Sequence, residues 1–427
     1  MLAGSRIPLV AFVASRAYVA AVAALTVLLG GTHATNPTLY DPAGLARPFG
    51  GSASGALVGV WARWDAIWYL RIAVDGYDPD GFSPAFFPLY PGLSWIVGLG
   101  ISRETVFLGG LAVALGSFAV ALSLLFRLTE LELGRRAATI AVLAIAVFPT
   151  SVFFSGLYTE SLFLALSVAA VWFGRTDRWW LAGLAAGAAT ATRSAGLALL
   201  VPLALLYLLG PRGTGSGERP YLGVRRRESG PRTYPLGRDA AALALVPVGL
   251  LAYVGFLAAA GGEPLRFADA QELWQREMVH AGPVPLGPLG GVALGTQAAF
   301  DGAREIVTGA APTALWRLDG GPVYPAAQAV ELFAYLFVAA VGIVGALRRL
   351  PVAYGAYAAV ALALPLTYPA DVTPLFSLSR FVVVLFPVFM WFGAVARTPR
   401  RLWPPVVVSL VLLTWTTARW ASWQWVA

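Results

Sequence analysis

The carboxylate of Asp65 stands between two tryptophans, Trp64 and Trp68, within residues 61–91, WARWDAIWYLRIAVDGYDPDGFSPAFFPLYP. A carboxylate among aromatic side chains at a membrane surface is costly to desolvate, so it needs either a structural partner or a chemical role. The chemical role open to a single carboxylate is that of a general base, which takes a proton from a reacting hydroxyl. The alternative interpretation is an interfacial aromatic anchor with incidental acids.

A short helix over residues 64–73 would order the first part of this stretch. Four side chains would then share one face of the helix: Asp65, Trp68, Tyr69 and Ile72. We expect Gly76 to end the helix and Arg71 to pair with Asp75, four residues further on. The prolines that follow predict a stiff aromatic turn over residues 84–91: Pro84, Pro88 and Pro91.

An acid also stands at the start of a later apolar helix, in residues 148–163, FPTSVFFSGLYTESLF. Glu160 would lie at the N-terminus of that helix, where a negative charge suits the helix dipole. An ionisable residue at membrane depth is a candidate for function. The alternative is a helix cap with hydroxyl packing around it.

Two arginines interrupt apolar stretches. Arg193, in ATATRSAG, lies near the middle of residues 179–210, and Arg380, in PLFSLSRF, lies at the outer end of a late stretch. An arginine that faces lipid is costly, so each must face a polar cavity, pair with an acid or lie at a turn. Since arginine binds phosphate through two parallel hydrogen bonds, either could hold a lipid phosphate. A structural ion pair with Glu160 or another acid fits equally well.

These residues need helices that cross a membrane to position them. The 427 residues are 58% hydrophobic and only 12% charged, with a mean hydropathy of +0.71. Apolar runs long enough to span a bilayer recur, which predicts an all-α polytopic membrane protein with one integral-membrane domain over residues 1–427. We expect about eleven spans, near 7–30, 104–126, 137–153, 158–174, 179–192, 194–210, 239–261, 323–347, 351–369, 381–396 and 403–420. Residues 179–210 could instead form one long helix.

The net charge of +8 comes from arginine alone, because lysine is absent. Arginine gathers in five short segments that we predict to be cytoplasmic, as is the N-terminus: 127–136, 175–178, 211–238, 348–350 and 397–402. The two long loops, 31–103 and 262–322, would then be extracytoplasmic. We therefore assign the charge to membrane orientation and anionic-lipid contact, not to nucleic acid, and 211–238 to a basic flexible connector.

Other kinds of site have little support. The chain has no cysteine, only two histidines and no GxxxxGK[ST] loop, which argues against thiolate chemistry, a zinc site and a nucleotide-phosphate loop. In the second long loop, Gln271, Trp274 and Gln275 are residue types that contact sugars. We favour an amphipathic interfacial helix for residues 269–277.

Three motifs in this order resemble the PIG-V mannosyltransferase family, which adds the second mannose of GPI anchors, and its prokaryotic relatives. The motifs are RWDAIWYLRIAVDGY with FFPLYP, then FPTSVFFSGLYTESLF, then ATRSAG, and the similarity returns weakly at SLSRFVVVLFPVF. Eukaryotic relatives often have a histidine where this chain has Trp68, which weakens transfer of the GPI substrate. Residues 211–238 match nothing in the family.

The resemblance implies a GT-C glycosyltransferase fold, a polyprenyl-phosphate sugar donor, inversion at the anomeric carbon and Asp65 as the catalytic acid residue. One carboxylate base suffices, because a polyprenyl phosphate leaves readily, unlike the alcohol released by glycosidases. We expect Arg193 and Arg380 to bind the donor phosphate. Further substrate contacts are expected from Arg63, Trp64, Trp68, Tyr69, Asp75, Tyr90, Tyr158 and Glu160. No cofactor is required, although Asp75 and Asp78 leave a divalent metal open.

The expected reaction transfers a sugar, mannose in the first instance, to a hydroxyl of a glycan, a glycolipid or a protein. The arginine-only, alanine- and glycine-rich composition indicates a prokaryotic plasma membrane, with catalysis outside. Three alternatives stay open: a different polyprenyl-linked sugar, a transporter or flippase of a lipid-linked sugar, and a non-catalytic subunit of a glycosylation complex. A transporter should show paired half-repeats, and the sequence has no visible repeat.

Overall fold

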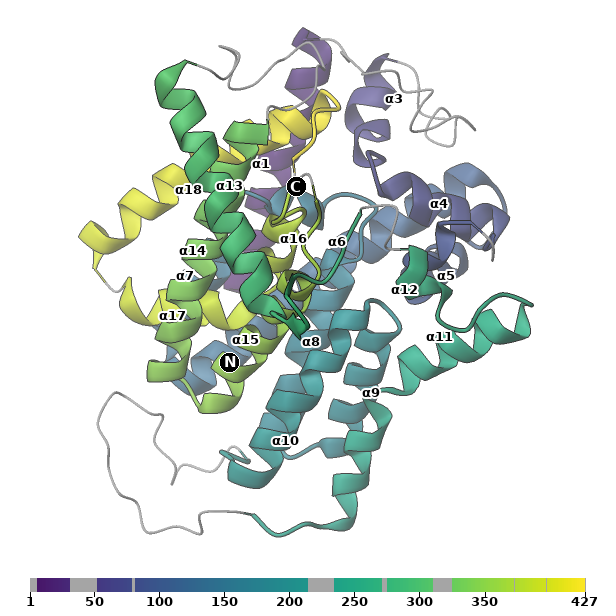
Figure 1. The fold of residues 1–427 in the computed structure, drawn as a ribbon, viewed down its shortest axis with the longest axis vertical. Helices are drawn as coiled ribbons and strands as arrows, with labels where there is room; N and C mark the ends of the chain where they lie inside the picture. Colours follow the sequence, from purple (N-terminus) through teal and green to yellow (C-terminus); the bar gives the residue numbers. More distant parts are fainter. Residues whose placement is uncertain are drawn as a thin grey trace.

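The computed structural model describes residues 6–30, 52–78, 81–213, 234–270, 275–309, 325–371, 373–396 and 398–426. These residues are predominantly helical, as the sequence predicted (Figure 1). Among them, regular strands are limited to a two-stranded hairpin of β1 (His280–Ala281) and β2 (Val284–Pro285). Residues 79–80, 271–274 and most of the basic segment 211–238 lie outside the described parts, and so do Gln271 and Trp274.

A helical bundle forms the core of the molecule. Its members are α6 (Arg103–Leu133), α7 (Arg135–Ala146), α8 (Glu160–Arg175), α9 (Trp179–Thr190), α10 (Leu200–Leu209), α14 (Pro325–Arg349), α15 (Val352–Thr367) and α17 (Phe386–Val395). α6 packs against α7 and α8, and α17 packs against α7 and α14. Small residues allow close approach: a Cβ on Gly183 of α9 would lie 2.2 Å from the carbonyl oxygen of Ala242. The 3₁₀ segment η6 (Arg238–Leu245) occupies that space.

Each of the eleven predicted spans coincides with a helical segment, but the number of membrane spans is not confirmed. Many of these helices have 10–16 residues, and at 1.5 Å per residue they reach about 24 Å at most, less than a hydrocarbon core of about 30 Å. Within the described residues, three helices are long and apolar enough to cross a membrane: α1 (Arg6–Gly30), α6 and α14. The bent pair of η6 and α11 (Val248–Ala259) would be a fourth.

The stretch 179–210 folds as two helical segments. α9 ends at Thr190, Arg193 is extended, and η5 (Ser194–Leu199) leads into α10. The rings of Trp179, at the start of α9, and Tyr207, near the end of α10, lie 4.7 Å apart. Because the first and last turns of the stretch are in contact, the chain reverses at residues 191–193.

The described part of the first long loop contains three helices: α3 (Ser52–Leu57), α4 (Ala66–Asp75) and α5 (Leu89–Val97). α4 confirms the predicted short helix and ends at Gly76, whose φ of +86° suits a residue without a Cβ. The predicted turn over residues 84–91 is only partly correct. The 3₁₀ turn η3 (Ser83–Ala85) precedes α5 (Leu89–Val97), and Pro91 lies in the first turn of α5, where its missing N–H breaks no helical hydrogen bond.

The described part of the second long loop contains more helix than the sequence indicated. α12 (Arg266–Asp269) is short, and α13 (Pro288–Thr308) packs on α14 and α15. The amphipathic helix expected over residues 269–277 does not include residues 275–277, because Arg276 forms an isolated antiparallel bridge with Ala370. Residues 271–274 lie outside the described parts. α13 escaped prediction because small residues such as Gly295 and Gly302, not large apolar ones, form its buried face.

The last helix, α18 (Pro399–Ala421), packs against α1, and the C-terminal residues then meet the first long loop. A cluster of apolar side chains joins α4, the start of α6, residues 152–162 and the end of α18. Large apolar residues are exposed along the outer faces of α1, α14 and α18. Exposed apolar faces of this kind are compatible with a multi-pass membrane protein.

Candidate active site

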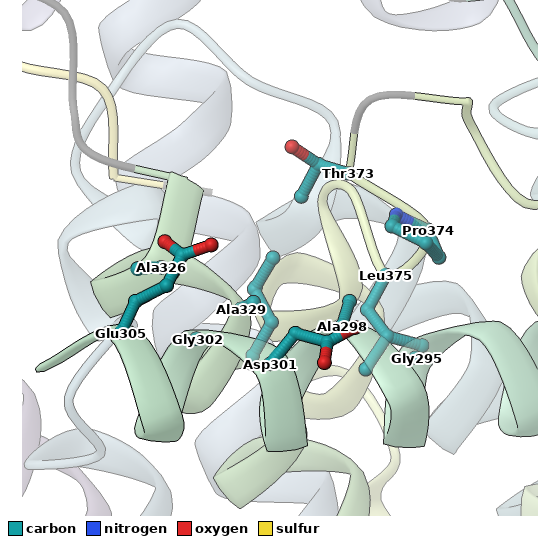
Figure 2. A pocket seen from close by; sticks show the side chains of 11 residues that line it. Gly295, Ala298, Asp301, Gly302, Glu305, Ala326, Ala329, Thr373, Pro374 and Leu375 are labelled. Atoms are coloured by element: carbon teal, nitrogen blue, oxygen red, sulfur yellow. The ribbon is translucent and has the colours of Figure 1, made fainter. Parts of the chain in front are cut away.

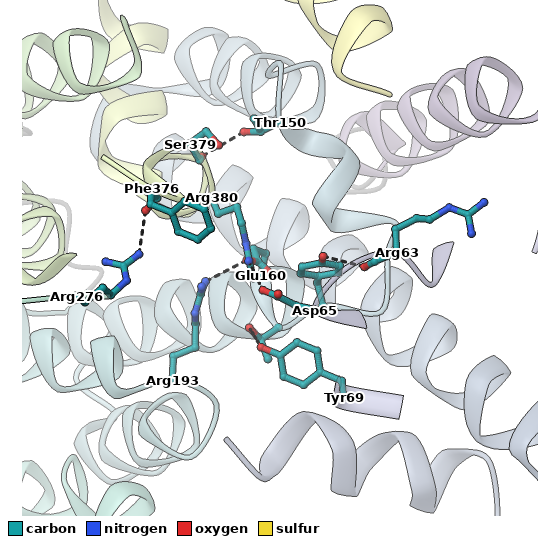
Figure 3. Close-up of polar contacts among 12 residues, drawn as sticks. Arg63, Asp65, Tyr69, Thr150, Glu160, Arg193, Arg276, Phe376, Ser379 and Arg380 are labelled. Atoms are coloured by element: carbon teal, nitrogen blue, oxygen red, sulfur yellow. Dashed lines mark hydrogen bonds and ion pairs between the residues drawn. The ribbon is translucent and has the colours of Figure 1, made fainter. Parts of the chain in front are cut away.

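Charged side chains from four segments meet at the start of α4 (Figure 3). Arg380 donates from Nη1 to Oδ2 of Asp65 at 2.5 Å and from Nε to Oε1 of Glu160 at 2.8 Å. A second arginine, Arg193, places its Nη1 3.3 Å from the same oxygen of Glu160. Two predicted acids and two predicted arginines therefore form one network.

Asp65 occupies the N-cap position of α4 but does not cap the helix. An aspartate there usually accepts a hydrogen bond from the first turn, a contact worth about 1 kcal/mol. The carboxylate of Asp65 makes no such bond and points to Arg380 instead. Trp64, directly before it, has a φ of +55°, which is unusual for a residue with a side chain. Among the described residues, nothing donates a hydrogen bond to the other oxygen of Asp65, whose side chain is 15% exposed.

Glu160 begins α8, as predicted, and its side chain is fully buried. Its contact with Arg193 is an ion pair without hydrogen-bond geometry, because Nη1 of Arg193 has no hydrogen-bond partner. The guanidinium of Arg193 also lies 5.1 Å from the ring of Phe381, and its side chain is 15% exposed. Arg193 thus retains hydrogen-bond donors at a partly open position.

Arg380 is more completely occupied. α16 (Leu378–Val383) carries it, and its guanidinium lies 4.7 Å from the ring of Tyr158 and 5.3 Å from that of Phe153. The neighbouring carbonyl of Ser379 accepts a hydrogen bond from Thr150 at 3.2 Å. Arg380 therefore joins the two carboxylates across a packed aromatic surface.

Two tyrosines border the network. The hydroxyl of Tyr69 lies 3.4 Å from Oγ1 of Thr159, and burial, with a smaller effect from the charge of Glu160, raises the pKa of Tyr69 to about 12. Tyr69 is therefore protonated at neutral pH and can donate a hydrogen bond. Tyr158 donates to the carbonyl of Arg63 at 2.9 Å, which ties residues 61–65 to the start of α8.

Other predicted contact residues lie elsewhere. The guanidinium of Arg63 points away from the network and stacks 4.3 Å from the ring of Trp423; burial lowers its pKa to about 9. Trp68 stacks on Phe86, and buried Tyr90 donates to the carbonyl of Gly110.

Asp75 is exposed at the far end of α4, about 15 Å along the helix from Asp65. Arg71 lies over Trp68, and no ion pair in the described chain joins it to Asp75. Substrate contacts by these residues stay predictions.

Two residues near the network escaped the sequence analysis. Arg276 donates to the carbonyl oxygens of Phe376 at 2.9 Å and Tyr368 at 3.2 Å. The ring of Trp425 stacks on that of Phe376 at 5.0 Å and meets the ring of Trp64 edge-on at 5.0 Å. The only signal for Trp425 in the sequence is the tryptophan-rich end, RWASWQW.

A cavity of about 110 Å³ lies apart from this network, between α13, α14 and residues 373–375 (Figure 2). Asp301 and Glu305 of α13 line it together with Ala329, Thr373 and Leu375. None of the residues of the charged network lines this cavity. We therefore place the candidate active site at the network, where charge and conformational strain coincide.

The described parts of the chain hold no group of three histidine, aspartate or glutamate side chains that could bind a metal ion. Asp75 and Asp78, the pair considered for a divalent metal, are both exposed. Asp78 is held through its backbone, whose N–H and carbonyl both bond the hydroxyl of Ser83.

The family model for mannosyltransferase (PIG-V) matches residues 9–206, which include Asp65, Glu160 and Arg193. No curated protein matched the chain. The apo crystal structure of the Archaeoglobus fulgidus oligosaccharyltransferase has a TM-score of 0.41 at 15% identity, covering 97% of this chain and 56% of that one.

A second solved structure is the archaeal oligosaccharyltransferase AglB from Archaeoglobus fulgidus in complex with an inhibitory peptide and a dolichol-phosphate. It has a TM-score of 0.40 at 14% identity, covering 84% of this chain and 52% of that one. The chain thus spans about half the length of these proteins. Residues 9–206 match the PIG-V mannosyltransferase family, which confirms the resemblance carried by the three sequence motifs.

Proposed function

We propose that the chain is an inverting GT-C glycosyltransferase that moves a sugar, most simply mannose, from a polyprenyl phosphate to a hydroxyl acceptor on the extracytoplasmic side of the plasma membrane. The observation that carries this proposal is the network of Asp65, Arg380, Glu160 and Arg193. Its members come from segments that the arginine distribution assigns to the same side of the membrane. The mannosyltransferase family match over residues 9–206 supports the sugar and the reaction class.

In this mechanism Asp65 accepts the proton of the acceptor hydroxyl through its unbonded carboxylate oxygen. The hydroxyl oxygen attacks the anomeric carbon from the face opposite the phosphate and forms the new glycosidic bond. The bond between that carbon and the phosphate oxygen breaks, and its electron pair leaves with the polyprenyl phosphate. A single displacement of this kind inverts the anomeric centre.

We assign Arg193 and Arg380 different roles in the site. Arg193 has free donors and is partly exposed, so we assign it the main contact with the departing phosphate. Arg380 already bonds both carboxylates, so we assign it the orientation of Asp65. Its positive charge also attracts the phosphate electrostatically. Glu160 lowers the electrostatic cost of holding two buried arginines together.

The proposed reaction does not need a strong base. A phosphate leaves without protonation, so the acceptor needs to lose its proton only as its bond to carbon forms. This chemistry needs no cofactor. The protonated hydroxyl of Tyr69 can donate a hydrogen bond to the sugar or the acceptor.

A transfer assay tests the proposal. Purified protein in neutral-lipid vesicles would be given a panel of polyprenyl-phosphate sugars with a hydroxyl acceptor, and the product would be analysed for anomeric configuration. We expect release of polyprenyl phosphate together with an inverted glycoside. Movement of the lipid-linked sugar between leaflets without a glycosylated product would refute the enzyme and favour a transporter.

A further inference from the structure

Arg276, in the second long loop, lies near Arg380 and has no part in the proposed mechanism. Residues 275–277 lie antiparallel to residues 369–371: Glu277 donates from its backbone to Pro369 at 3.1 Å, and Asp371 donates to Gln275 at 3.2 Å. The Arg276 guanidinium is fixed by the carbonyls of Tyr368 and Phe376. Phe376 precedes Arg380 by four residues, so the two arginines are joined through a short segment.

The charge of Arg276 is not balanced by an acid in the described chain. Its side chain bonds only carbonyl oxygens, and it forms no ion pair with a described carboxylate. In Figure 3, Arg276 lies on the same side of Arg380 as Arg193. Among the described residues, three arginines, Arg193, Arg276 and Arg380, lie near two carboxylates, Asp65 and Glu160. Counted over these five side chains, the network with Arg276 carries one more positive than negative charge.

The guanidinium of Arg276 also has donors to spare. An arginine carries five N–H donors, of which the two carbonyl bonds occupy two. Burial, reinforced by the nearby charge of Arg380, lowers the pKa of Arg276 to about 10, so the side chain is charged at neutral pH. A half-buried cation without a counter-ion is costly unless an anion binds beside it.

We infer that Arg276 binds the phosphate of the lipid-linked donor together with Arg193, so that the second long loop forms part of the donor site. This inference rests on the proposed function for the identity of the anion. A sugar phosphodiester carries one negative charge, which matches the uncompensated charge of the network. After transfer the phosphate becomes a monoester with a charge of about −1.5 to −2, which the third arginine helps to stabilise.

Binding measurements in neutral detergent test this assignment independently of transfer. The probes are a polyprenyl phosphate, the uncharged polyprenol of equal length and phosphatidylglycerol. The variants are R276Q, R276K and, as a matched control, R304Q on the exposed face of α13. We expect R276Q to weaken polyprenyl-phosphate binding about tenfold or more, as for loss of a hydrogen bond to a charged group. Polyprenol binding should be unchanged, R276K intermediate and R304Q like the wild type.

Three outcomes would overturn the assignment. The first is equal polyprenyl-phosphate affinity in R276Q and R304Q. The second is parallel loss of polyprenyl-phosphate and polyprenol binding in R276Q, which would indicate a purely structural arginine. The third is an equal loss for phosphatidylglycerol, which would indicate a general lipid contact. A wild-type protein that binds polyprenyl phosphate but transfers no sugar would contradict the proposed function and leave this binding site standing.

Discussion

Asp65 and Glu160 share one arginine, and this sharing gives each acid a different environment. Asp65 is partly exposed and keeps one oxygen unbonded, whereas Glu160 is fully buried between Arg380 and Arg193. Buried ion pairs add little net stability, but removing one member of a pair leaves an uncompensated charge that costs about 3–5 kcal/mol. The network therefore adds little to the net stability of the fold while it is intact.

Arg193→Gln tests the phosphate contact at the level of one residue. The substitution removes a partly exposed cation whose donors are unused, so we expect the donor KM to rise about tenfold or more while the protein still folds. Steady-state transfer kinetics with varied donor would measure it. Arg178→Gln, at the exposed opposite end of α9, is the control. Unchanged donor KM and kcat in Arg193→Gln would exclude the phosphate role.

The charged residues of the site were predictable from sequence because a charge inside an apolar run is conspicuous. Asp65, Glu160, Arg193 and Arg380 were all singled out on that ground, and the structure brings them together. Arg276 was not singled out, since a loop arginine looks ordinary until its neighbours are known. The sequence analysis also offered a structural ion pair with Glu160 as the alternative to phosphate binding. Both Arg193 and Arg380 form this ion pair.

At the scale of elements, the C-terminal residues after α18 join the two segments that carry Asp65 and Arg380. Trp425 contacts Trp64, directly before Asp65, and stacks on Phe376, four residues before Arg380. Trp64 has a φ of +55°, and Ser377, next to Phe376, has a φ of +63°. Strained backbone persists only where surrounding contacts hold it, and Trp425 supplies such contacts on both sides.

Trp425→Ala tests whether the ring contacts of Trp425 with Trp64 and Phe376 position Asp65 and Arg380. Loss of the ring should let residues 64 and 376 relax, separate Asp65 from Arg380, and lower kcat for transfer more than it raises donor KM. Trp425→Phe should restore much of the activity, because it keeps a stacking ring. Trp403→Ala, on the exposed side of α18, is the control. Wild-type kcat in Trp425→Ala would show that these ring contacts do not affect the rate of transfer.

Elements with a clear apolar pattern were predictable, and elements defined by tertiary contacts were not. α4 and its end at Gly76 agree with the prediction. α5 begins within the predicted proline turn because proline is tolerated in a first helical turn. α13 was missed, since it buries glycines against neighbouring helices and leaves apolar residues such as Phe300 exposed.

At the scale of the whole molecule, the candidate site is separate from a second buried cluster of charged residues. The segments predicted to be extracytoplasmic contribute Asp65, Arg193 and Arg380 to the candidate site. The ends predicted to be cytoplasmic meet at a second cluster: Nε of Arg175 donates to Oε1 of Glu132 at 2.6 Å, and the hydroxyl of Tyr354 donates to the same oxygen at 2.8 Å. This second cluster joins the ends of α6 and α8 to the start of α15 and has no contact with the candidate site.

Tyr354→Phe should therefore affect stability without affecting chemistry. The variant loses a buried hydrogen bond to a carboxylate, which corresponds to about 1.5–3 kcal/mol, so we expect a lower midpoint of thermal unfolding in detergent. Transfer activity per folded molecule, measured well below that midpoint, should equal the wild type. Tyr357→Phe on the same helix is the control, because the buried hydroxyl of Tyr357 bonds no carboxylate. A loss of kcat with unchanged thermal stability in Tyr354→Phe would contradict the separation of the two clusters.

The most direct test of the central claim is the rate of sugar transfer by Asp65→Asn. This variant keeps the size of the side chain and removes the base, so we predict a fall in kcat of about 10²–10⁴-fold, with polyprenyl-phosphate binding close to wild type. Because Arg380 loses one of its two counter-charges, the midpoint of thermal unfolding should fall, and the rate is therefore compared per folded molecule well below that midpoint. Glu263→Gln, an exposed acid of the second long loop, should transfer sugar at the wild-type rate. Full transfer activity in folded Asp65→Asn would contradict the assignment of Asp65 as the base.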